Sequence, residues 1–132
     1  MGEFRNGNYE GHGYDLWMTP PEIFEEMESW FPGWNKENMF DPCPAYWDGE
    51  VDGLSIDWPT DKLVFVNPPY GNIAEWVKKC REQADRGCSV VLLIPARTDT
   101  RYFHDHIYMS AELMFLKGRI KFIHADEPDK RW

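Results

Sequence analysis

Four consecutive residues, Asn67-Pro68-Pro69-Tyr70, have the types and the order needed to hold a planar amine. The two prolines fix the backbone and donate no N–H, so the carbonyl of Pro68 can face a pocket beside the side-chain carbonyl of Asn67. These two acceptors can take both hydrogens of an exocyclic NH2 group, while the face of Tyr70 stacks on the ring that carries it. The nitrogen lone pair then points toward an electrophile opposite. A proline-rich turn after a strand, without such a role, is the alternative interpretation.

Polar residues also follow two other apolar stretches. Asp41-Pro42 comes directly after Met39-Phe40, and residues 95–99, Pro-Ala-Arg-Thr-Asp, follow an apolar run. In sheets of α/β proteins, ligands bind outside the carboxyl ends of the strands, so the three turns together predict a site at one edge of a sheet. The chain has no G-x-G-x-x-G loop, and a dinucleotide or diphosphate cradle is therefore not expected.

Hydrophobic periodicity predicts strands and helices that alternate along the chain. The predicted strands are residues 39–41, 63–66, 89–94, 111–116 and 119–123. The predicted helices are the segment that Thr19 caps and Pro32-Gly33 ends, residues 72–86 and residues 100–108. Fully apolar strands between helices predict a parallel sheet that is covered on both faces.

The chain of 132 residues has the length of one domain. Residues 1–16 are polar and glycine-rich, which predicts a flexible N-terminal arm ahead of a domain over residues 17–132. Thr19, Pro20 and Glu22 show the Thr-x-x-Glu pattern of a capping box with proline at the first helical position. This pattern predicts that the first helix begins at Pro20.

Cysteine usage and hydropathy favour an intracellular protein. The three cysteines are odd in number and share no metal-ligand spacing, so they are interpreted as reduced thiols without a structural bridge. No apolar run is long enough to span a bilayer, and the N-terminus lacks the apolar region of a signal peptide. We expect a cytoplasmic protein that does not bind membranes.

Several motifs occur in one register over roughly residues 17–123. They are Trp17-Met18-Thr19-Pro20-Pro21, Phe40-Asp41-Pro42-Cys43-Pro44-Ala45, Asp52-Gly53-Leu54, Asp57-Trp58, Asn67-Pro68-Pro69-Tyr70-Gly71, Pro95-Ala96-Arg97-Thr98-Asp99-Thr100 and Lys117-Gly118-Arg119-Ile120-Lys121-Phe122. Together these motifs resemble those of phage-type DNA N6-adenine methyltransferases. The last two motifs make the resemblance specific, because other amino-methyltransferases share the Asn-Pro-Pro-Tyr turn.

The resemblance implies a fold, a reaction and a cofactor. The fold is an α/β, Rossmann-like methyltransferase sheet with helices on both faces. The reaction moves a methyl group from S-adenosylmethionine to the N6 amino group of adenine in double-stranded DNA, and it needs no metal. The base must leave the helix to be methylated, because its amine lies inside the stack. If the chain is encoded by a phage, it acts in the host cytoplasm.

The resemblance also implies roles for the cofactor motifs. Trp17, Thr19 and Pro20 match the N-terminal cofactor motif, in which the threonine and the start of the helix receive the methionine carboxylate. Asp41 and Pro42 match the motif after the first strand, where the acid is placed for the cofactor's amino group or ribose.

The next two motifs complete the implied site. Asp57 matches the acid that accepts from the adenine N6 of the cofactor, with Trp58 beside it. The implied catalytic turn consists of Asn67, Pro68, Pro69 and Tyr70. The cofactor motifs precede the catalytic motif along the chain, as they do in the family.

DNA contact needs a local basic face, because the net charge of the chain is −9. Residues 1–66 carry 14 acidic and 3 basic side chains, whereas residues 67–132 carry 9 acidic and 11 basic ones. For Arg97 and Arg101, an ion pair with Asp99 or Asp105 is the alternative to a role in DNA binding. The candidates for contact with DNA phosphates are Arg97, Arg101, Lys117, Arg119 and Lys121.

The sequence departs from the family in three respects. Asp41-Pro42-Cys43-Pro44-Ala45 stands where methyltransferases in general have a Gly-x-Gly loop, and only 15 residues separate Asp41 from Asp57. No further apolar strand follows Ile123, so a minimal or truncated sheet is expected.

Two functional alternatives stay open at this point. One is methylation of another amide or amine, such as a protein glutamine. The other is an inactive, truncated methyltransferase that acts as an interaction module. A homodimer is also open, because exposed tryptophans or a bare sheet edge could drive association.

Overall fold

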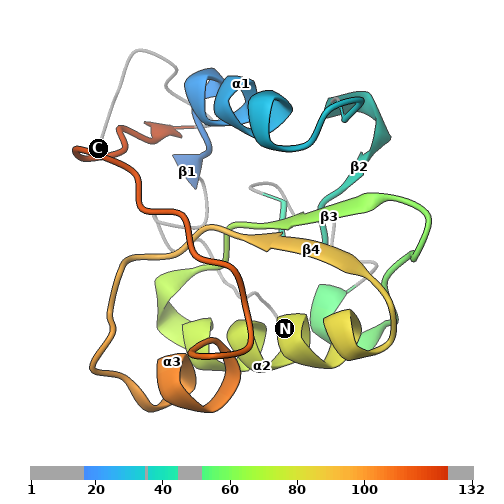
Figure 1. Cartoon of the computed structure of the whole chain (residues 1–132), viewed down its shortest axis with the longest axis vertical. Helices are drawn as coiled ribbons and strands as arrows, with labels where there is room; N and C mark the ends of the chain where they lie inside the picture. Colours follow the sequence, from blue (N-terminus) through green and yellow to red (C-terminus); the bar gives the residue numbers. More distant parts are fainter. Residues whose placement is uncertain (1–16, 35, 45–51, 125–132) are drawn as a thin grey trace.

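The computed structural model describes residues 17–34, 36–44 and 52–124. A parallel sheet lies at its centre, with the strands β2 (Met39–Phe40), β3 (Leu63–Val66) and β4 (Ser89–Leu92) in that order (Figure 1). Phe40 pairs with Val64, and Val66 pairs with Leu92. The three predicted strands of this sheet are confirmed, with ends that differ from the prediction by at most two residues.

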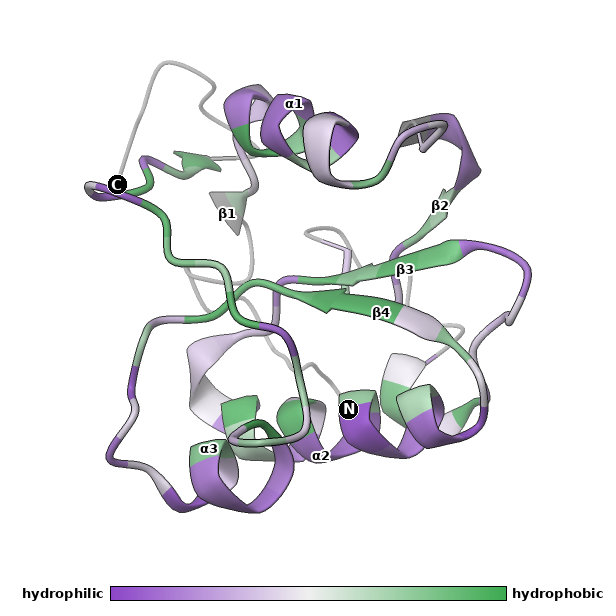
Figure 2. Cartoon of the chain, in the orientation of Figure 1, coloured by the Kyte–Doolittle hydropathy of each residue, from purple (hydrophilic) through white to green (hydrophobic). Residues whose placement is uncertain are grey.

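The two faces of the sheet bury different side chains, as the alternation of a strand requires. Phe65 packs with Met27 of α1 (Pro21–Trp30) and with Trp34 on one face. Val64 and Val66 pack with side chains of α2 (Ile73–Asp85) on the other. Figure 2 shows the strands as hydrophobic and the outward surfaces of the helices as hydrophilic. Helices therefore cover both faces, and the predicted α/β architecture is confirmed.

Helix α2 follows β3 and returns the chain to the start of β4, as two adjacent parallel strands require. Its residues Trp76, Val77 and Cys80 are buried, as their helical spacing predicts. The chain leaves the helix at Gly87, whose φ of +112° suits glycine best. Helix α3 (Arg101–His106) begins after Thr100, whose hydroxyl accepts a hydrogen bond from the N–H of Phe103. It packs on α2 through Phe103 and Val77.

The predicted capping box at the start of α1 is wrong. The helix begins at Pro21, the N-cap is Pro20, and no side chain caps the helix. The hydroxyl of Thr19 accepts a hydrogen bond from Asn67 instead. Local sequence suggested a cap because Thr-x-x-Glu is a local pattern, but a distant polar partner competes for the same hydroxyl.

The two predicted strands at 111–116 and 119–123 are also wrong, except for Ile123. Residues 111–116 form no strand, and their large side chains are largely exposed, including Phe115 at 74%. The only residues of this region in a strand are those of β5 (Ile123–His124), which pairs antiparallel with β1 (Trp17–Met18). An apolar run becomes a strand only where a sheet edge offers hydrogen-bonding partners, and the sequence does not show where that edge lies.

Part of the predicted organisation lies outside the described residues. The expected arm at residues 1–16 and the end of the domain at residues 125–132 are not described, so these domain limits stay predictions. Among the residues that the structure describes, no helix has the length and apolar character needed to cross a bilayer.

Candidate active site

The turns after β2, β3 and β4 lie at the same edge of the sheet, because the three strands are parallel. β3 and β4 run toward the left of Figure 1, where α2 begins. If the register of β2 and β3 is continued, Asp41 is level with Phe65, two residues before Asn67. Strand spacings then place the Cα atoms of Asp41 and Asn67 about 8 Å apart. The fold thus brings together two residues that are 26 positions apart in the sequence.

Asn67 is tied to the start of the described chain. Its side-chain Nδ2 donates to the hydroxyl oxygen Oγ1 of Thr19 over 3.1 Å, in a half-buried position. Because Nδ2 is engaged in this bond, the carbonyl oxygen Oδ1 is the end of the amide that suits an incoming amine. The predicted cofactor motif and the predicted catalytic turn therefore meet in one hydrogen bond.

The rest of the turn combines a rigid backbone with an accessible ring. Pro68 is buried, and Pro69 has a φ of −67° and leads into the short 3-10 helix η4 (Tyr70–Asn72). Tyr70 is 42% exposed, so its side chain offers surface to a ligand. Partial burial raises the pKa of Tyr70, and the charge of Arg119 lowers it in part. This interaction places the predicted DNA contact Arg119 within electrostatic range of the catalytic turn.

The surroundings of Asp41 disfavour the charged form of its carboxyl group. Burial raises the pKa of its carboxyl to about 6, although a hydrogen bond from the backbone N–H of Cys43 to Oδ1, 2.9 Å long, lowers it in part. A carboxylate that is kept from water gains most from a cationic or hydrogen-bonding ligand. The environment of Asp41 therefore fits the amino group or the ribose of a cofactor.

The loop behind Asp41 is held by a residue that the sequence analysis did not single out as part of the site. Gly53 begins η3 (Gly53–Ser55), and a Cβ atom at this position would overlap the carbonyl oxygen of Pro42. The N-cap of η3 is Asp52, whose side chain accepts from the N–H of Leu54. Asp52-Gly53-Leu54 was one of the matching motifs in the sequence, but the contact of Gly53 with Pro42 depends on the tertiary structure.

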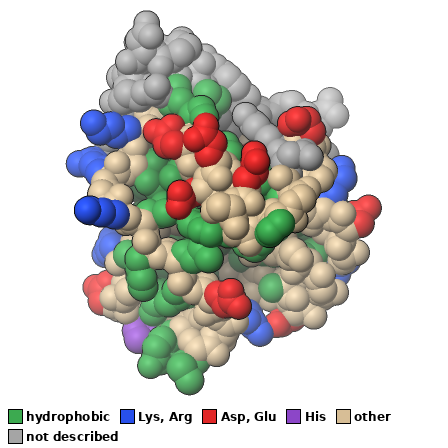
Figure 3. Space-filling view, turned by 45° about the horizontal axis from the view of Figure 1, so that its top comes forward, with side chains coloured by type: hydrophobic (Ala, Val, Ile, Leu, Met, Phe, Trp, Pro, Cys, Tyr) green, Lys and Arg blue, Asp and Glu red, His purple; other side chains and the backbone are tan. Residues whose placement is uncertain are grey.

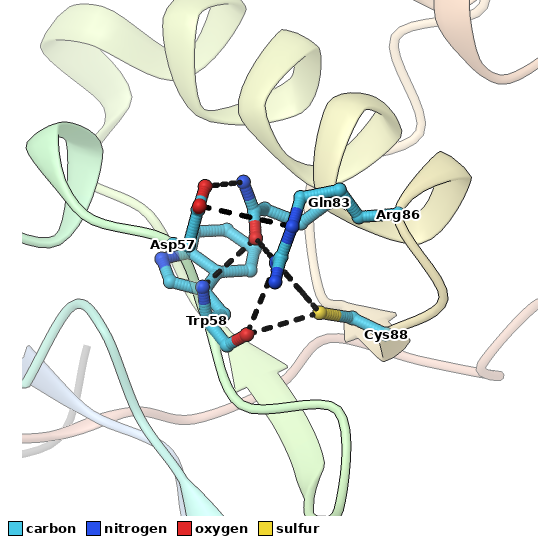
Figure 4. A network of polar contacts seen from close by, with 5 residues as sticks. All are labelled: Asp57, Trp58, Gln83, Arg86 and Cys88. Atoms are coloured by element: carbon cyan, nitrogen blue, oxygen red, sulfur yellow. Dashed lines mark hydrogen bonds and ion pairs between the residues drawn. The ribbon is translucent and has the colours of Figure 1, made fainter.

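Asp57 and Trp58 lie at the other end of α2 (Figure 4). The carboxylate of Asp57 accepts from Nε2 of Gln83 over 3.1 Å and lies 3.7 Å from Nε of Arg86. Gln83 is ten residues from Ile73, the first residue of α2, which corresponds to about 15 Å along the helix axis. The structure therefore does not bring Asp57 together with Asn67.

Trp58 belongs to the core. Its side chain is 1% exposed and stacks on Trp76 at 6.4 Å between ring centroids. Its backbone N–H donates to Oε1 of the buried Gln83, and its ring Nε1 donates to the carbonyl of Gly53. A ring with almost no accessible surface cannot contact a cofactor directly. Through Gly53, however, Trp58 supports the loop that carries Pro42 and Asp41.

The predicted DNA contacts are all exposed. Arg97 lies 3.8 Å from the carboxylate of Asp99, which confirms the ion pair considered as an alternative, but 64% of its side chain is exposed. Figure 3 shows Lys and Arg side chains along the left-hand edge of the molecule, the side toward which β3 and β4 run in Figure 1. The other candidates with exposed side chains are Arg101, Lys117, Arg119 and Lys121.

The three cysteines lie in the described part of the chain, and the surroundings of Cys80 alter the pKa of its thiol. Cys43, Cys80 and Cys88 are in the reduced state and form no disulfide bridge with one another. Burial raises the pKa of Cys80 to about 12, so its thiol is unreactive at neutral pH. In the described part of the chain, no group of three or more His, Cys, Asp or Glu residues is arranged to hold a metal ion.

The comparison with known protein families agrees with this arrangement. Residues 7–131 match the family described as DNA N-6-adenine-methyltransferase (Dam). The chain belongs to the Dam family. The match includes every predicted site residue, from Trp17 to Lys121.

Two phage relatives of this Dam-family chain carry the description DNA N-6-adenine-methyltransferase. The protein of Escherichia phage T1 is 28% identical over 110 residues, which are 79% of this chain and 45% of the relative. The protein of Haemophilus phage HP1 (strain HP1c1) is 26% identical over 122 residues, which are 85% of this chain and 68% of the relative. The chain thus spans less than half the length of the T1 protein. No solved structure matches the chain.

Proposed function

We propose that this Dam-family chain transfers a methyl group from S-adenosylmethionine to the N6 amino group of adenine in double-stranded DNA, in the cytoplasm. The observation that carries the proposal is the Asn67-Pro68-Pro69-Tyr70 turn at the carboxyl edge of the sheet. Its amide is held by Thr19, and its tyrosine ring is accessible. Family membership supports the same reaction.

The residues at the sheet edge fit the proposed cofactor. S-adenosylmethionine, when bound, supplies an electrophilic methyl group. We propose that Asp41 accepts from its amino group or ribose, beside Pro42, because a carboxylate whose pKa is raised by burial gains from a positively charged or donating partner. In this proposal, the methionine carboxylate of the cofactor lies next to Thr19 and Pro20, with Trp17 nearby. The Thr19 hydroxyl can serve both partners, because it accepts from Asn67 and still has a proton to donate.

Asp57 and Trp58 enter the proposal in an indirect role. They form the network at the end of α2, in which Trp58 holds the carbonyl of Gly53. Gly53 in turn packs on Pro42, next to Asp41. We propose that this pair supports the cofactor loop from behind rather than contacting the adenine of the cofactor.

The catalytic turn acts on the amine of the target base. The carbonyl groups of Asn67 and Pro68 accept its two N–H hydrogens, and Pro69 keeps the backbone of the turn in place. The lone pair of N6 would thereby face the methyl group that the cofactor supplies. As the C–N bond forms, the S–CH3 bond would break and S-adenosylhomocysteine would leave, and the methylated amine would give its extra proton to water. Stacking on Tyr70 offsets about 1–3 kcal/mol of the cost of removing the base from the helix, which is on the order of a few kcal/mol.

Double-stranded DNA approaches, in this proposal, from the side on which the basic residues lie. The phosphate contacts are Arg97, Arg101, Lys117, Arg119 and Lys121. Arg119 is best placed among them to act near the flipped base, because its charge reaches Tyr70. A protein of net charge −9 should make few such contacts, and its non-specific affinity for DNA should therefore be low.

Transfer of a labelled methyl group tests the proposal. Purified protein is incubated with methyl-labelled S-adenosylmethionine and either duplex DNA or a mixture of proteins, and digestion of the labelled DNA identifies the modified base. N6-methyladenine formed by wild-type protein but not by Asn67→Ala is the expected result. Label in protein but not in DNA would instead favour the amide alternative. Binding of cofactor without any transfer would favour an interaction module.

A further inference from the structure

The hydrogen bond between Thr19 and Asn67 bears on which end of the catalytic amide faces the target amine. A side-chain amide has two chemically different ends, an acceptor oxygen and a donor NH2 group. If the NH2 end faced the target amine, two donors would oppose each other. Rotation of the side chain by half a turn is enough to exchange the two ends, so the turn itself does not determine which end faces the amine.

Thr19 is a hydrogen-bond partner that selects the NH2 end of this amide when its own proton is given to another acceptor. Its Oγ1 lies 3.1 Å from Nδ2 of Asn67, the two residues are 48 positions apart, and the bond is half-buried. Thr19 lies between β1, which pairs with β5, and Pro20, whose side chain is fully buried. The threonine is therefore positioned by elements other than β3, the strand that Asn67 directly follows.

We propose that Thr19 is a positioning residue that sets which end of the Asn67 amide faces the target amine. The inference rests on the proposed methyl transfer and extends it to a residue outside the catalytic turn. When the Thr19 proton is donated to a ligand or to water, its oxygen remains an acceptor for Nδ2. The amide oxygen Oδ1 then points to the position of the amine.

A double-mutant cycle tests the proposal. Asn67→Asp replaces the amide by a carboxylate, whose two oxygens are equivalent acceptors, so no orientation needs to be selected. Single-turnover transfer is measured at saturating cofactor and DNA for Thr19→Val, both in otherwise wild-type protein and in combination with Asn67→Asp. We expect Thr19→Val to lower the rate roughly three- to tenfold when the amide is present, the factor that corresponds to one neutral hydrogen bond. In the Asn67→Asp background we expect a change of less than about twofold, because a carboxylate with two equivalent oxygens has no orientation for Thr19 to select.

Two control variants accompany the cycle. Thr19→Ser keeps the hydroxyl and should restore most of the rate, whereas Thr60→Val removes a hydroxyl from an exposed residue before β3 and should change nothing. Equal losses in the two backgrounds would overturn the proposal, because Thr19 would then act on the cofactor or on the fold rather than through the amide. An unchanged rate of Thr19→Val in otherwise wild-type protein would overturn it as well.

A readout without catalysis separates this inference from the proposed function. In protein labelled with ¹⁵N-asparagine, the side-chain amide of Asn67 is the signal that Asn67→Asp removes. We expect slow hydrogen exchange of one of its two protons in wild-type protein, and fast exchange in Thr19→Val. Exchange that Thr19→Val leaves unchanged overturns the inference, even in an active enzyme. A Thr19-dependent signal in a protein that methylates nothing supports the inferred bond and overturns only the proposed function.

Discussion

Replacing Asp41 by asparagine should stabilise the protein and weaken cofactor binding at the same time. Burial raises the pKa of the carboxyl from 3.8 to about 6. Because each unit corresponds to about 1.4 kcal/mol, the charged form costs the folded state about 3 kcal/mol at neutral pH. Asparagine has nearly the same shape and keeps an oxygen that can accept from the N–H of Cys43. It carries no charge, so the free energy of unfolding should rise by up to that amount.

The dependence of this effect on pH follows from the direction of the shift. The folded state binds the proton of Asp41 more tightly than the unfolded state, so the penalty is complete above about pH 6. It diminishes as the pH falls, to about 1 kcal/mol at pH 4.5, and disappears below the unfolded pKa of 3.8. The stability difference between Asp41→Asn and wild-type protein should therefore shrink by about two-thirds between pH 7.5 and 4.5.

Urea unfolding without cofactor, measured at both pH values, checks this prediction. Asp61→Asn, at an exposed position, is the control for removing one acidic charge. Calorimetric titration with S-adenosylmethionine at pH 7.5 should show affinity reduced by at least about tenfold, because a charge-assisted hydrogen bond is lost. A variant that is less stable than wild type at pH 7.5, or a difference that does not depend on pH, would refute the reasoning. Unchanged cofactor affinity would show that Asp41 does not contact the cofactor.

Three further predictions concern Gly53 behind the cofactor loop, the ring of Tyr70 and the basic residue Arg119. Gly53→Ala should destabilise the protein by about 1–3 kcal/mol and weaken cofactor binding, because its methyl group would displace the carbonyl of Pro42; urea unfolding that matches wild type would contradict the packing. Tyr70→Ala should slow transfer to duplex DNA more than transfer to a mismatched adenine, and equal losses in the methylation assay would exclude the stacking role. Arg119→Ala should leave cofactor affinity unchanged and reduce the salt dependence of DNA binding by about one phosphate contact; a salt slope near zero in wild-type protein would argue against DNA as the substrate.

Local patterns determined much of this protein from the sequence alone. The apolar run Leu63 to Val66 predicted a buried strand, the apolar stripe of residues 72–86 predicted an amphipathic helix, and both are present. The Asn67-Pro68-Pro69-Tyr70 turn was recognisable because prolines restrict the backbone by themselves. These features depend on residues close in sequence, so their signals survive without knowledge of the fold.

Tertiary structure decided where the remaining residues act. Thr19 carries the local signature of a helix cap, yet its hydroxyl bonds to Asn67, 48 positions away. Asp57 lies in a motif before β3, yet its carboxylate is engaged by Gln83 and Arg86 at the far end of α2. A polar group has few partners and takes those that the fold brings within about 3 Å. Which partners these are depends on contacts between distant segments, and no local pattern encodes them.

The same reason explains the strands that were predicted wrongly. Residues 111–116 have the apolar composition of a strand, but a strand exists only through hydrogen bonds to a neighbour, and in this structure they lack that pairing. Ile123 and His124 pair instead with Trp17 and Met18, from the opposite end of the described chain. The sequence determined which segments can be extended or helical and which turn can hold an amine. Only the packing of the whole chain decided which segments pair and which side chains meet at the site.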